Sequence, residues 1–464
     1  MILNIIYWAT QKKWLLITLF LGTVLYLFPT PHGLTSEGYH TLIIVLSTII
    51  LIIFEPIPLP AVAMLILVFQ VLFGIATPNQ VASSFMSDAV FFIMGSLMLA
   101  VAIVSQGLDT RLALGIINIT GHKTWRIIAG FVAVCALLSS FIGEHTVTAM
   151  MMPVGLTLVR HTSHDPKKVT GLTTLILFSI AYGSAMGSIG TPSGGGRNVI
   201  MIGYLSQFGM GNISYLEWMK YAYPILLIEI PLATMILWWT FRPEKTILDS
   251  AVRKLKVQVA KSGDITGSQV TAIGVFILVF LGWVFLSPKI GLGIVALLGV
   301  VIYLVIGLVE WRDLNRNTNW GVIMFFGAAI SIGIQMKDTG AALWVANNVI
   351  ERLGVITPNI DFSRSFVSVF LTAGLTNFLS NAATVAVLGP IVLNMGGDAV
   401  MIALSTALAS AFAYLTVVAS PTCMIIHSSG LIKPSDFLRG GWKMTVMSIV
   451  VLLLFIHLFW PLMG

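Results

Sequence analysis

Long apolar runs are the feature that most limits what this chain can fold into. Examples are WLLITLFLGTVLYLF at 14–28, TLIIVLSTIILIIF at 41–54 and MTVMSIVVLLLFIHLFWPLM at 444–463. Each run approaches the roughly 20 apolar residues that a helix needs to cross a bilayer. Only 9% of the 464 residues are charged, whereas a soluble domain carries about 25%. The sequence therefore predicts an all-α, polytopic membrane protein.

The apolar runs fall into two halves of similar order, joined by a polar linker at 242–267. The first half, 1–241, has predicted spans near 14–30, 39–54, 58–75, 89–106 and 224–241, a broken segment at 125–160 and a broken span at 172–208. The second half, 268–464, has predicted spans near 268–287, 289–309, 320–336 and 441–463, a broken segment at 362–395 and a broken span at 401–431. If both broken segments are re-entrant hairpins, about eleven true spans remain.

The basic residues indicate an orientation. With eleven spans and a cytoplasmic N-terminus, most of the 25 lysines and arginines lie in cytoplasmic loops, as the positive-inside rule requires. This distribution explains the net charge of +7 without a nucleic-acid partner. The two cysteines lie in separate apolar segments and form no zinc or disulfide pattern. We expect a multi-pass protein of the cell membrane.

The two halves contain matching motifs. SSFIGEHTVTAMMMP at 139–153 aligns with TNFLSNAATVAVLGP at 376–390, and GTPSGG at 190–195 aligns with ASPTCM at 419–424. An odd number of predicted crossings separates the copies, so they have opposite orientations. Inverted repeats with interrupted segments at matching positions are typical of secondary transporters. Irregular backbone is tolerated in a membrane where it lines a cavity, and there it offers carbonyls to cations and helix N-termini to anions.

Glu144 and His145 are polar residues at the centre of the first motif. An intramembrane carboxylate is costly and usually functional. Glu144 has three interpretations: a structural carboxylate, a sodium ligand or a proton carrier. His145 either caps a helix or adds positive charge for an anion, because its usual pKa lies near 6.5. Glu229 and His427, also within apolar runs, are more simply interpreted as packing or hydrogen-bonding residues.

The stretch TPSGGGRN at 191–198 is the other unusual motif. Its glycines expose backbone N–H groups beside a helix start, which favours an anion. Arg197 is a cation at that same helix N-terminus, where the helix dipole opposes it. Arg197 therefore needs a partner. The partner is either Glu144, in a buried structural pair, or an anionic group of the substrate.

On these motifs the chain resembles the divalent anion/sodium symporter family, the relatives of the dicarboxylate and citrate carriers. The resemblance covers the order of spans, both hairpins and the proline-marked breaks. Family members carry Ser-Asn-Thr followed by Ala-Thr at each hairpin tip. The second tip, Ser380-Asn381-Ala382-Ala383-Thr384, keeps four of these five residues. The first tip has Gly143-Glu144-His145 in place of Ser-Asn-Thr, and Arg197 is also a departure.

The resemblance implies an elevator-type transporter. The hairpins and broken spans would form a transport domain, and the remaining helices would form a scaffold that makes a homodimer in the lipid bilayer. Sodium would be the coupling ion, with no organic cofactor. The implied sodium ligands are Ser139, Glu144 and backbone at Gly190 in the first half, and Thr376, Asn381 and backbone at Ala419 in the second.

The favoured function is sodium-coupled symport of a small anion, with proton coupling as a second option; the anion is a dicarboxylate, monocarboxylate, sulfate or sulfonate. The residues expected to face the anion are His145, Thr146, Gly194, Gly195, Gly196, Arg197, Ser380, Asn381, Ala382, Ser420 and Thr422. One alternative is a cation/proton exchanger that uses Glu144. A membrane-embedded enzyme fits less well, because adjacent helical residues do not face each other and the chain has no HExxH or GxSxG motif.

Overall fold

The computed structural model describes residues 12–107, 119–163, 165–250, 252–254, 265–353, 360–417 and 419–463. Within these ranges the chain is helical and has no β-strand, only an isolated bridge between Lys123 and Ile247. This bridge fixes the start of the linker, 242–267, against the beginning of the first broken segment. The remainder of the linker falls largely outside the described residues, at 251 and 255–264.

The first half is built from helices and short helical turns. They are α2 (Lys13–Leu27), α3 (Ser36–Phe54), α4 (Leu59–Leu72), α5 (Pro78–Phe85), α6 (Asp88–Ser105), α8 (Thr124–Ile142), α9 (Glu144–Thr162), α10 (Thr170–Gly187), the 3₁₀ turn Pro192–Gly194, α11 (Gly196–Gln207) and α12 (Tyr215–Thr240). A further 3₁₀ turn, Pro166–Val169, precedes α10.

The second half repeats much of this order. Its helices are α14 (Gly267–Phe285), α15 (Ser287–Ile290), α16 (Leu292–Val305), α17 (Trp311–Asn317), α18 (Trp320–Asp338), α19 (Ala341–Leu353), α20 (Ile360–Leu375), α21 (Asn381–Leu393), α22 (Ala399–Ala409), α23 (Pro421–His427) and α24 (Pro434–Leu454). The chain then continues helically through Phe455–Phe459 and Trp460–Leu462.

Both broken segments and both broken spans are interrupted where the sequence predicts. Gly143 alone separates α8 from α9, and its φ of 85° lies in the left-handed region that favours glycine. Residues 376–380 separate α20 from α21. The two broken spans open at 188–195 and at 410–420, each just before or around a proline.

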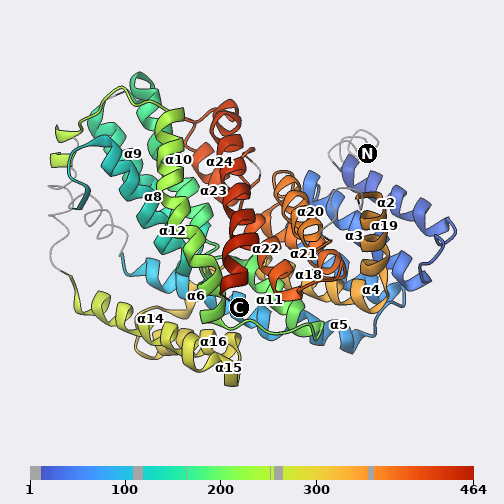
Figure 1. The fold of residues 1–464 in the computed structure, drawn as a ribbon. Coiled ribbons are helices and arrows are strands. Elements are labelled where there is room, and N and C mark those ends of the chain that lie inside the picture. The colour runs from blue at the N-terminus through green and yellow to red at the C-terminus, as the bar shows by residue number, and fades with distance from the viewer. Residues whose placement is uncertain are drawn as a thin grey trace, which may run out of the picture.

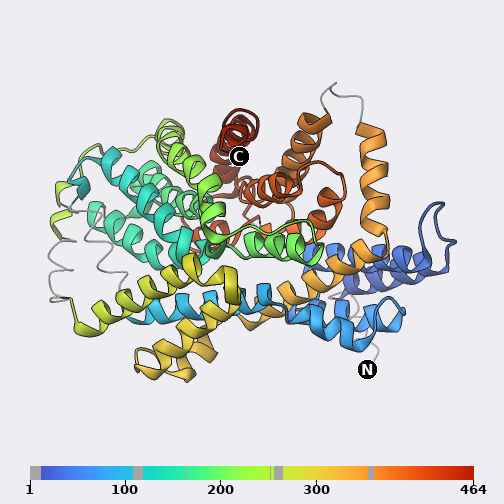
Figure 2. The ribbon, with the colours of Figure 1, turned by 60° about the horizontal axis from the view of Figure 1, so that its bottom comes forward.

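The helices form two groups that meet along the centre of the molecule. In Figure 1, α8, α9, α10 and α12 stand together at the left with α23 and α24 beside them, while α2, α3, α4, α18 and α19 lie to the right. Helix α16 packs against both α6 and α14, and Figure 2 shows the yellow helices beside the light-blue α6. Helix α11 follows the first broken span, and α21 follows the second broken segment. These two helices contact each other and α18, so both of these breaks face the centre.

Eight of the described helices are long and apolar enough to cross a membrane: α3, α6, α8, α10, α12, α14, α18 and α24 with its extension. Shorter apolar helices include α2, α4, α16, α21 and α22. An all-helical fold with many apolar helices is therefore confirmed. The count of eleven spans and the re-entrant course of the two broken segments stay predictions.

Some boundaries differ from those expected. Helix α12 begins at Tyr215, nine residues before the predicted span, because Ser214 and Glu217 form a reciprocal cap with N···O distances of 3.1 and 3.3 Å. Pro224, the first residue of the predicted span, lies inside the helix. The short helices α5, α17 and α19 were not expected, because their apolar runs are shorter than a span.

Replacing Gly187 with alanine should loosen the contact between α8 and α10. A Cβ at Gly187 would lie 2.1 Å from the carbonyl oxygen of Ala136, and backbone cannot rotate away as a side chain can. Overpacking of this kind costs about 1–3 kcal/mol. We expect a lower thermal unfolding midpoint for the purified protein in detergent.

The matched control is Gly274→Ala on α14, where a new Cβ would have no atom within 4 Å. Alanine has the higher helix propensity, so this variant should unfold at the same temperature or slightly higher. Equal midpoints for the two variants would contradict the packing argument.

Candidate functional site

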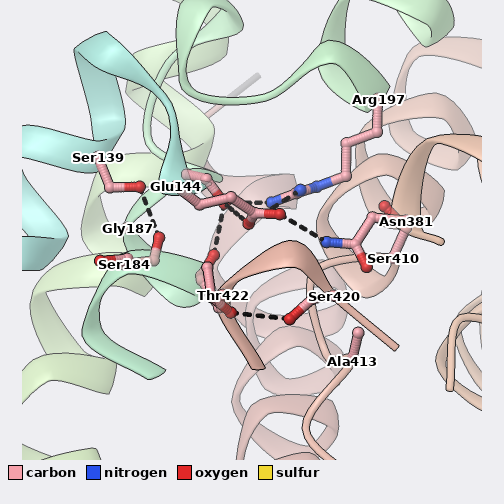
Figure 3. A network of polar contacts seen from close by, with 12 residues as sticks. Ser139, Glu144, Ser184, Gly187, Arg197, Asn381, Ser410, Ala413, Ser420 and Thr422 are labelled. Atoms are coloured by element: carbon pink, nitrogen blue, oxygen red, sulfur yellow. Dashed lines mark hydrogen bonds and ion pairs between the residues drawn. The ribbon is translucent and has the colours of Figure 1, made fainter. Parts of the chain in front are cut away.

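Four helix N-termini meet at the centre of the molecule, and each carries a polar side chain. Glu144 begins α9, Arg197 follows the first residue of α11, Asn381 begins α21, and Thr422 follows the first residue of α23. Figure 3 shows the first three pointing at one another, with Ser420 and Thr422 below them. The N-terminal end of each helix carries about half a positive charge. The meeting point is therefore electropositive before any side chain is considered.

Local sequence explains why these helices begin here. Ser380 and Ser420 are the N-cap residues of α21 and α23, and their hydroxyls accept hydrogen bonds from the backbone N–H groups of Ala383 and Cys423 at 3.4 and 3.3 Å. Gly143 precedes α9 and Gly195 precedes α11, so these two helix starts have no capping side chain. The N-terminal backbone N–H groups of α9 and α11 therefore lack a capping side chain and could bind another acceptor.

Glu144 supplies the carboxylate at this site. The residue is 6% exposed, and three side chains donate to its carboxylate: Ser188 at 2.8 Å, Asn381 at 3.0 Å and Arg197 at 3.3 Å. The Asn381 contact joins the two halves of the chain. Three donors and a helix N-terminus together stabilise the charged form of a group that is otherwise expensive to bury.

Arg197 is the cation of the site and is 2% exposed. Its guanidinium forms an ion pair with Glu144 and also donates to the hydroxyl of Ser188. Its Nε has no hydrogen-bond acceptor within the described part of the chain. The pairing of Arg197 with Glu144 is thus one of the two arrangements that the sequence allowed. The unused donor leaves room for a second acceptor.

A second polar set lies in the other half of the chain. The Thr376 hydroxyl donates to the carbonyl of Ser410 at 2.8 Å and to Oδ1 of Asn381 at 3.1 Å. Asn377 donates to the carbonyl of Phe412 at 3.3 Å. The oxygen atoms of Thr376, Asn381 and Ser410 therefore gather beside the α20–α21 break (Figure 3).

The first half has matching contacts at the aligned positions. Ser139, which aligns with Thr376, donates to the carbonyl of Ser184 at 2.5 Å. Ser140, which aligns with Asn377, donates to the carbonyl of Gly187 at 2.9 Å. Figure 3 places Ser139, Ser184 and Gly187 on the opposite side of Glu144 from Asn381 and Ser410. Each break thus has hydroxyl and carbonyl oxygens beside it.

The glycines of the TPSGGGRN stretch serve packing at two positions. A Cβ at Gly196 would lie 2.2 Å from the ring of Phe326, and one at Gly194 would lie 2.5 Å from the carbonyl oxygen of Ser188. The N–H of Gly194 is already bonded to the carbonyl of Thr191 at 3.1 Å. Gly195 and Gly196 are partly exposed whereas Gly194 is buried. Of the three predicted anion-binding amides, Gly194 thus already has an acceptor.

The remaining predicted residues lie around this centre. His145 and Thr146 are partly exposed, and the His145 ring lies beside Gly143. Ser420 and Thr422 share a hydrogen bond of 2.7 Å between their hydroxyls. Gly190 packs on the side chain of Ser140 rather than that of Ser139. The remaining two, Ala382 and Ala419, adjoin Asn381 and Ser420 in the chain.

Two residues of the site were not found from the sequence. Ser188 bridges Glu144 and Arg197. Asn198 secures the α10–α11 break by donating to the carbonyls of Ser188 and Thr191 at 2.9 and 2.8 Å. Ser188 lies outside the aligned motifs, so the repeat gave no signal. Asn198 is the last residue of TPSGGGRN. A polar amide next to Arg197 in a broken span indicates a side chain that could bond the free carbonyls of the break.

Comparison with known proteins shows a family match over nearly the whole chain. The model of the family described as "Sodium:sulfate symporter transmembrane region" matches residues 9–464. Sodium-dependent high-affinity dicarboxylate transporter 3 of Caenorhabditis elegans is 27% identical, over 87% of this chain and 80% of the relative. Sodium-dependent dicarboxylate transporter SdcS of Staphylococcus aureus is 26% identical, over 96% of this chain and 91% of the relative.

Two solved transporters share the fold at low sequence identity. The Alcanivorax borkumensis YdaH transporter has a TM-score of 0.55 and 12% identity, over 82% of this chain and 86% of that one. Neisseria gonorrhoeae MtrF has a TM-score of 0.55 and 11% identity, over 82% and 83%. These likenesses concern the fold alone.

A double-mutant cycle tests whether Glu144 and Arg197 depend on each other. Glu144→Gln removes the charge that faces Arg197 and keeps the shape of the side chain. A buried charge left without its partner destabilises a protein by about 3–5 kcal/mol, so we expect a clear fall in the thermal unfolding midpoint. Arg197→Met should do the same.

The double variant Glu144→Gln/Arg197→Met leaves no buried charge unpaired. Its midpoint should therefore lie well above the value obtained by adding the two single losses. Additive losses in the cycle would show that the pair is not coupled.

Proposed function

Because the chain belongs to the sodium:sulfate symporter family, we propose that it is a secondary transporter that couples the uptake of a small anion to sodium. Membership of this family confirms the prediction that the chain is a multi-pass membrane transporter and not an enzyme. It also confirms the resemblance drawn from the hairpin motifs. The proposal concerns which anion is carried, where the ions bind and how transport proceeds.

The convergence of four helix N-termini on Arg197 is the observation that carries the proposal. Helix N-termini attract anions, and a guanidinium binds carboxylate, sulfate or sulfonate through two parallel hydrogen bonds. Arg197 keeps Nε free within the described residues, as noted above. The free Nε and one terminal nitrogen form a suitable fork for an incoming oxyanion. Ser380, Ser420, Thr422, His145 and Thr146 would surround it.

Glu144 would link the anion to sodium. In the present state its carboxylate occupies the donors that an anion would use, namely Arg197, Ser188 and Asn381. An arriving anion would take over Arg197 and leave Glu144 with a full negative charge beside the carbonyl oxygens of the first break. Sodium would then bind Glu144 together with Ser139 and backbone near Gly190. Hard cations prefer such oxygen ligands.

A second sodium would bind in the other half of the chain. Thr376, Asn381 and the carbonyl of Ser410 already bring oxygen atoms together, and backbone near Ala419 would complete the set. Asn381 would connect the two ion sites. Its Nδ2 donates a hydrogen bond to Glu144, a ligand of the first ion, and its Oδ1 faces Thr376 at the second. No organic cofactor is needed for this cycle.

One arginine in the site sets the substrate class. A single oxyanion group suffices to engage Arg197, so a monocarboxylate, sulfate or sulfonate fits as well as a dicarboxylate. The dicarboxylate transporters among the relatives make dicarboxylates the first compounds to test. A cation/proton exchanger that uses Glu144 is less favourable, because every cation there would face the fixed charge of Arg197.

The transport domain would comprise the helices around the breaks and move as an elevator against a dimeric scaffold. Helices α12 and α24 pack on each other, and α12 also packs on α8 and α10. We therefore assign α12 and α24 to the moving part, whereas the resemblance alone assigned them to the scaffold. The N-terminus would be cytoplasmic, by the positive-inside rule.

Sodium-driven uptake is the direct test of this function. Purified protein in proteoliposomes should accumulate labelled succinate or sulfate when sodium is higher outside than inside. Asn381→Ala should abolish most of this uptake, because it removes a contact to Glu144 and an oxygen of the second ion site. Uptake that is unaffected by sodium in the wild type would refute the symporter.

The matched control is Asn394→Ala. Asn394 lies at the other end of the same helix, α21, where its amide donates to the carbonyl of Pro390 at 2.7 Å. This variant should transport nearly as well as the wild type.

Glu144→Gln tests the coupling itself. Coupling free energies of 1–3 kcal/mol are typical, so sodium should raise the affinity of the wild type for its anion by roughly 5- to 150-fold. In the Gln variant this effect should largely vanish, while affinity without sodium should rise because Arg197 no longer has an internal anion. Anion titrations by calorimetry, with and without sodium, measure both quantities. A Gln variant with the wild-type sodium effect would exclude Glu144 as the coupling group.

A further inference from the structure

Glu229 is a second intramembrane carboxylate, and the proposed sodium and anion sites do not use it. It lies in the middle of α12 and is 0% exposed. Neither carboxylate oxygen has a hydrogen-bond donor among the described residues. Glu144, by contrast, receives three donors, including a cation. The two buried glutamates therefore have opposite surroundings.

The neighbours of Glu229 are hydroxyl groups. Ser448 on α24 faces both the Glu229 carboxylate and the phenol of Tyr414, which lies in the connection between α22 and α23. Within the described residues, none of these three side-chain groups makes a hydrogen bond of good geometry. Three polar groups from three elements thus lie near one another in one buried site, without a hydrogen bond of good geometry between them in the present conformation.

No charged group compensates Glu229. Helices α8, α10, α14 and α24 pack against α12, and within the described residues they bring no lysine, arginine or histidine to the carboxylate. Tyr414 is the titratable group that faces it. A carboxylate ion in such surroundings would lose its hydration, and no nearby positive charge would compensate for that loss. The neutral acid loses far less, and its O–H can donate to either hydroxyl.

We propose that Glu229 is a proton-binding site of the transport cycle, which holds a proton in the present closed state and releases it in another. The ligand is the proton alone, and the bond formed and broken is the O–H bond of the carboxylic acid. The proposal rests on the function as a coupled transporter. It differs from proton transfer at Glu144, whose carboxylate forms an ion pair with Arg197.

Tyr414 connects the proton site with the ion pair. Its phenol is near enough to Glu229, Arg197 and Glu144 to feel the charge of each. Its backbone carbonyl accepts a hydrogen bond from Tyr182 at 2.9 Å, so the residue is held in place. When sodium and an anion separate Glu144 from Arg197, the field at Tyr414 and Glu229 changes. Proton binding and anion binding thereby influence each other, as linkage requires.

Complete burial is what a carried ion needs. A proton on Glu229 can reach neither side of the membrane while α12 and α24 remain packed, so exchange requires a movement of the helices. A purely structural acid would hold its proton in every state. A proton-carrying Glu229 and a structural Glu229 can be told apart by measuring whether protons cross the membrane during uptake.

The experiment compares proton and anion movement in proteoliposomes that contain a pH-sensitive dye. During sodium-driven uptake of succinate or sulfate, the wild type should change the internal pH, and an acidic outside should speed uptake. Glu229→Gln should keep the sodium-driven uptake and lose both proton effects. Glu217→Gln, on the same helix but at its exposed cap, should behave as the wild type.

A second readout does not depend on transport. Infrared spectra of the wild type should contain a carboxylic acid C=O band that is absent in Glu229→Gln and shifted in Ser448→Ala, which removes a hydroxyl partner. Absence of this band in the wild type overturns the proposal. Sodium-driven uptake without proton movement also overturns it and leaves the symporter intact. If sodium-driven uptake itself is missing, the symporter fails, and the infrared band alone still decides whether Glu229 holds a proton.

Discussion

The electropositive convergence of four helix N-termini is the constraint on which the rest of the structure depends. Helices α9, α11, α21 and α23 direct their N-terminal ends at one point inside a low-dielectric protein. Adding Arg197 makes the point more positive still, so an anion must be present. Glu144 supplies it in the present state. The pair is thus a consequence of the backbone, because the breaks that expose the N-termini create the charge requirement.

The same constraint explains why a transporter can be built here. A buried pair contributes little net stability, because desolvation offsets most of the attraction. In the proposed cycle, exchanging Glu144 for a substrate anion would therefore change the free energy only modestly, and sodium would decide the balance. Ser188 and Asn381 orient Glu144 in the present state. Asn381 also ties the two halves together through its hydrogen bond to Glu144.

The order of helices and the positions of the breaks were predictable, because apolar length, glycine and proline act locally. Gly143, Ser380 and Ser420 end or begin helices by their own backbone and side-chain chemistry. Ser188 and the buried state of Glu229 were not predictable. Their roles depend on which side chains from distant segments meet them, and neither has a counterpart in the repeat. Helix α12 begins nine residues before the predicted span, at a capping box formed by Ser214 and Glu217.

The sequence by itself determined that the chain is helical, lies in a membrane, repeats itself and places polar residues at interrupted segments. These properties follow from composition and from short-range rules of helix formation. Only the tertiary structure decided that Arg197 pairs with Glu144, that Asn381 reaches across to the same carboxylate, and that Glu229 is closed off with two hydroxyl groups. Such pairings join residues far apart in the chain. Their energies depend on distance and burial, which no local pattern contains.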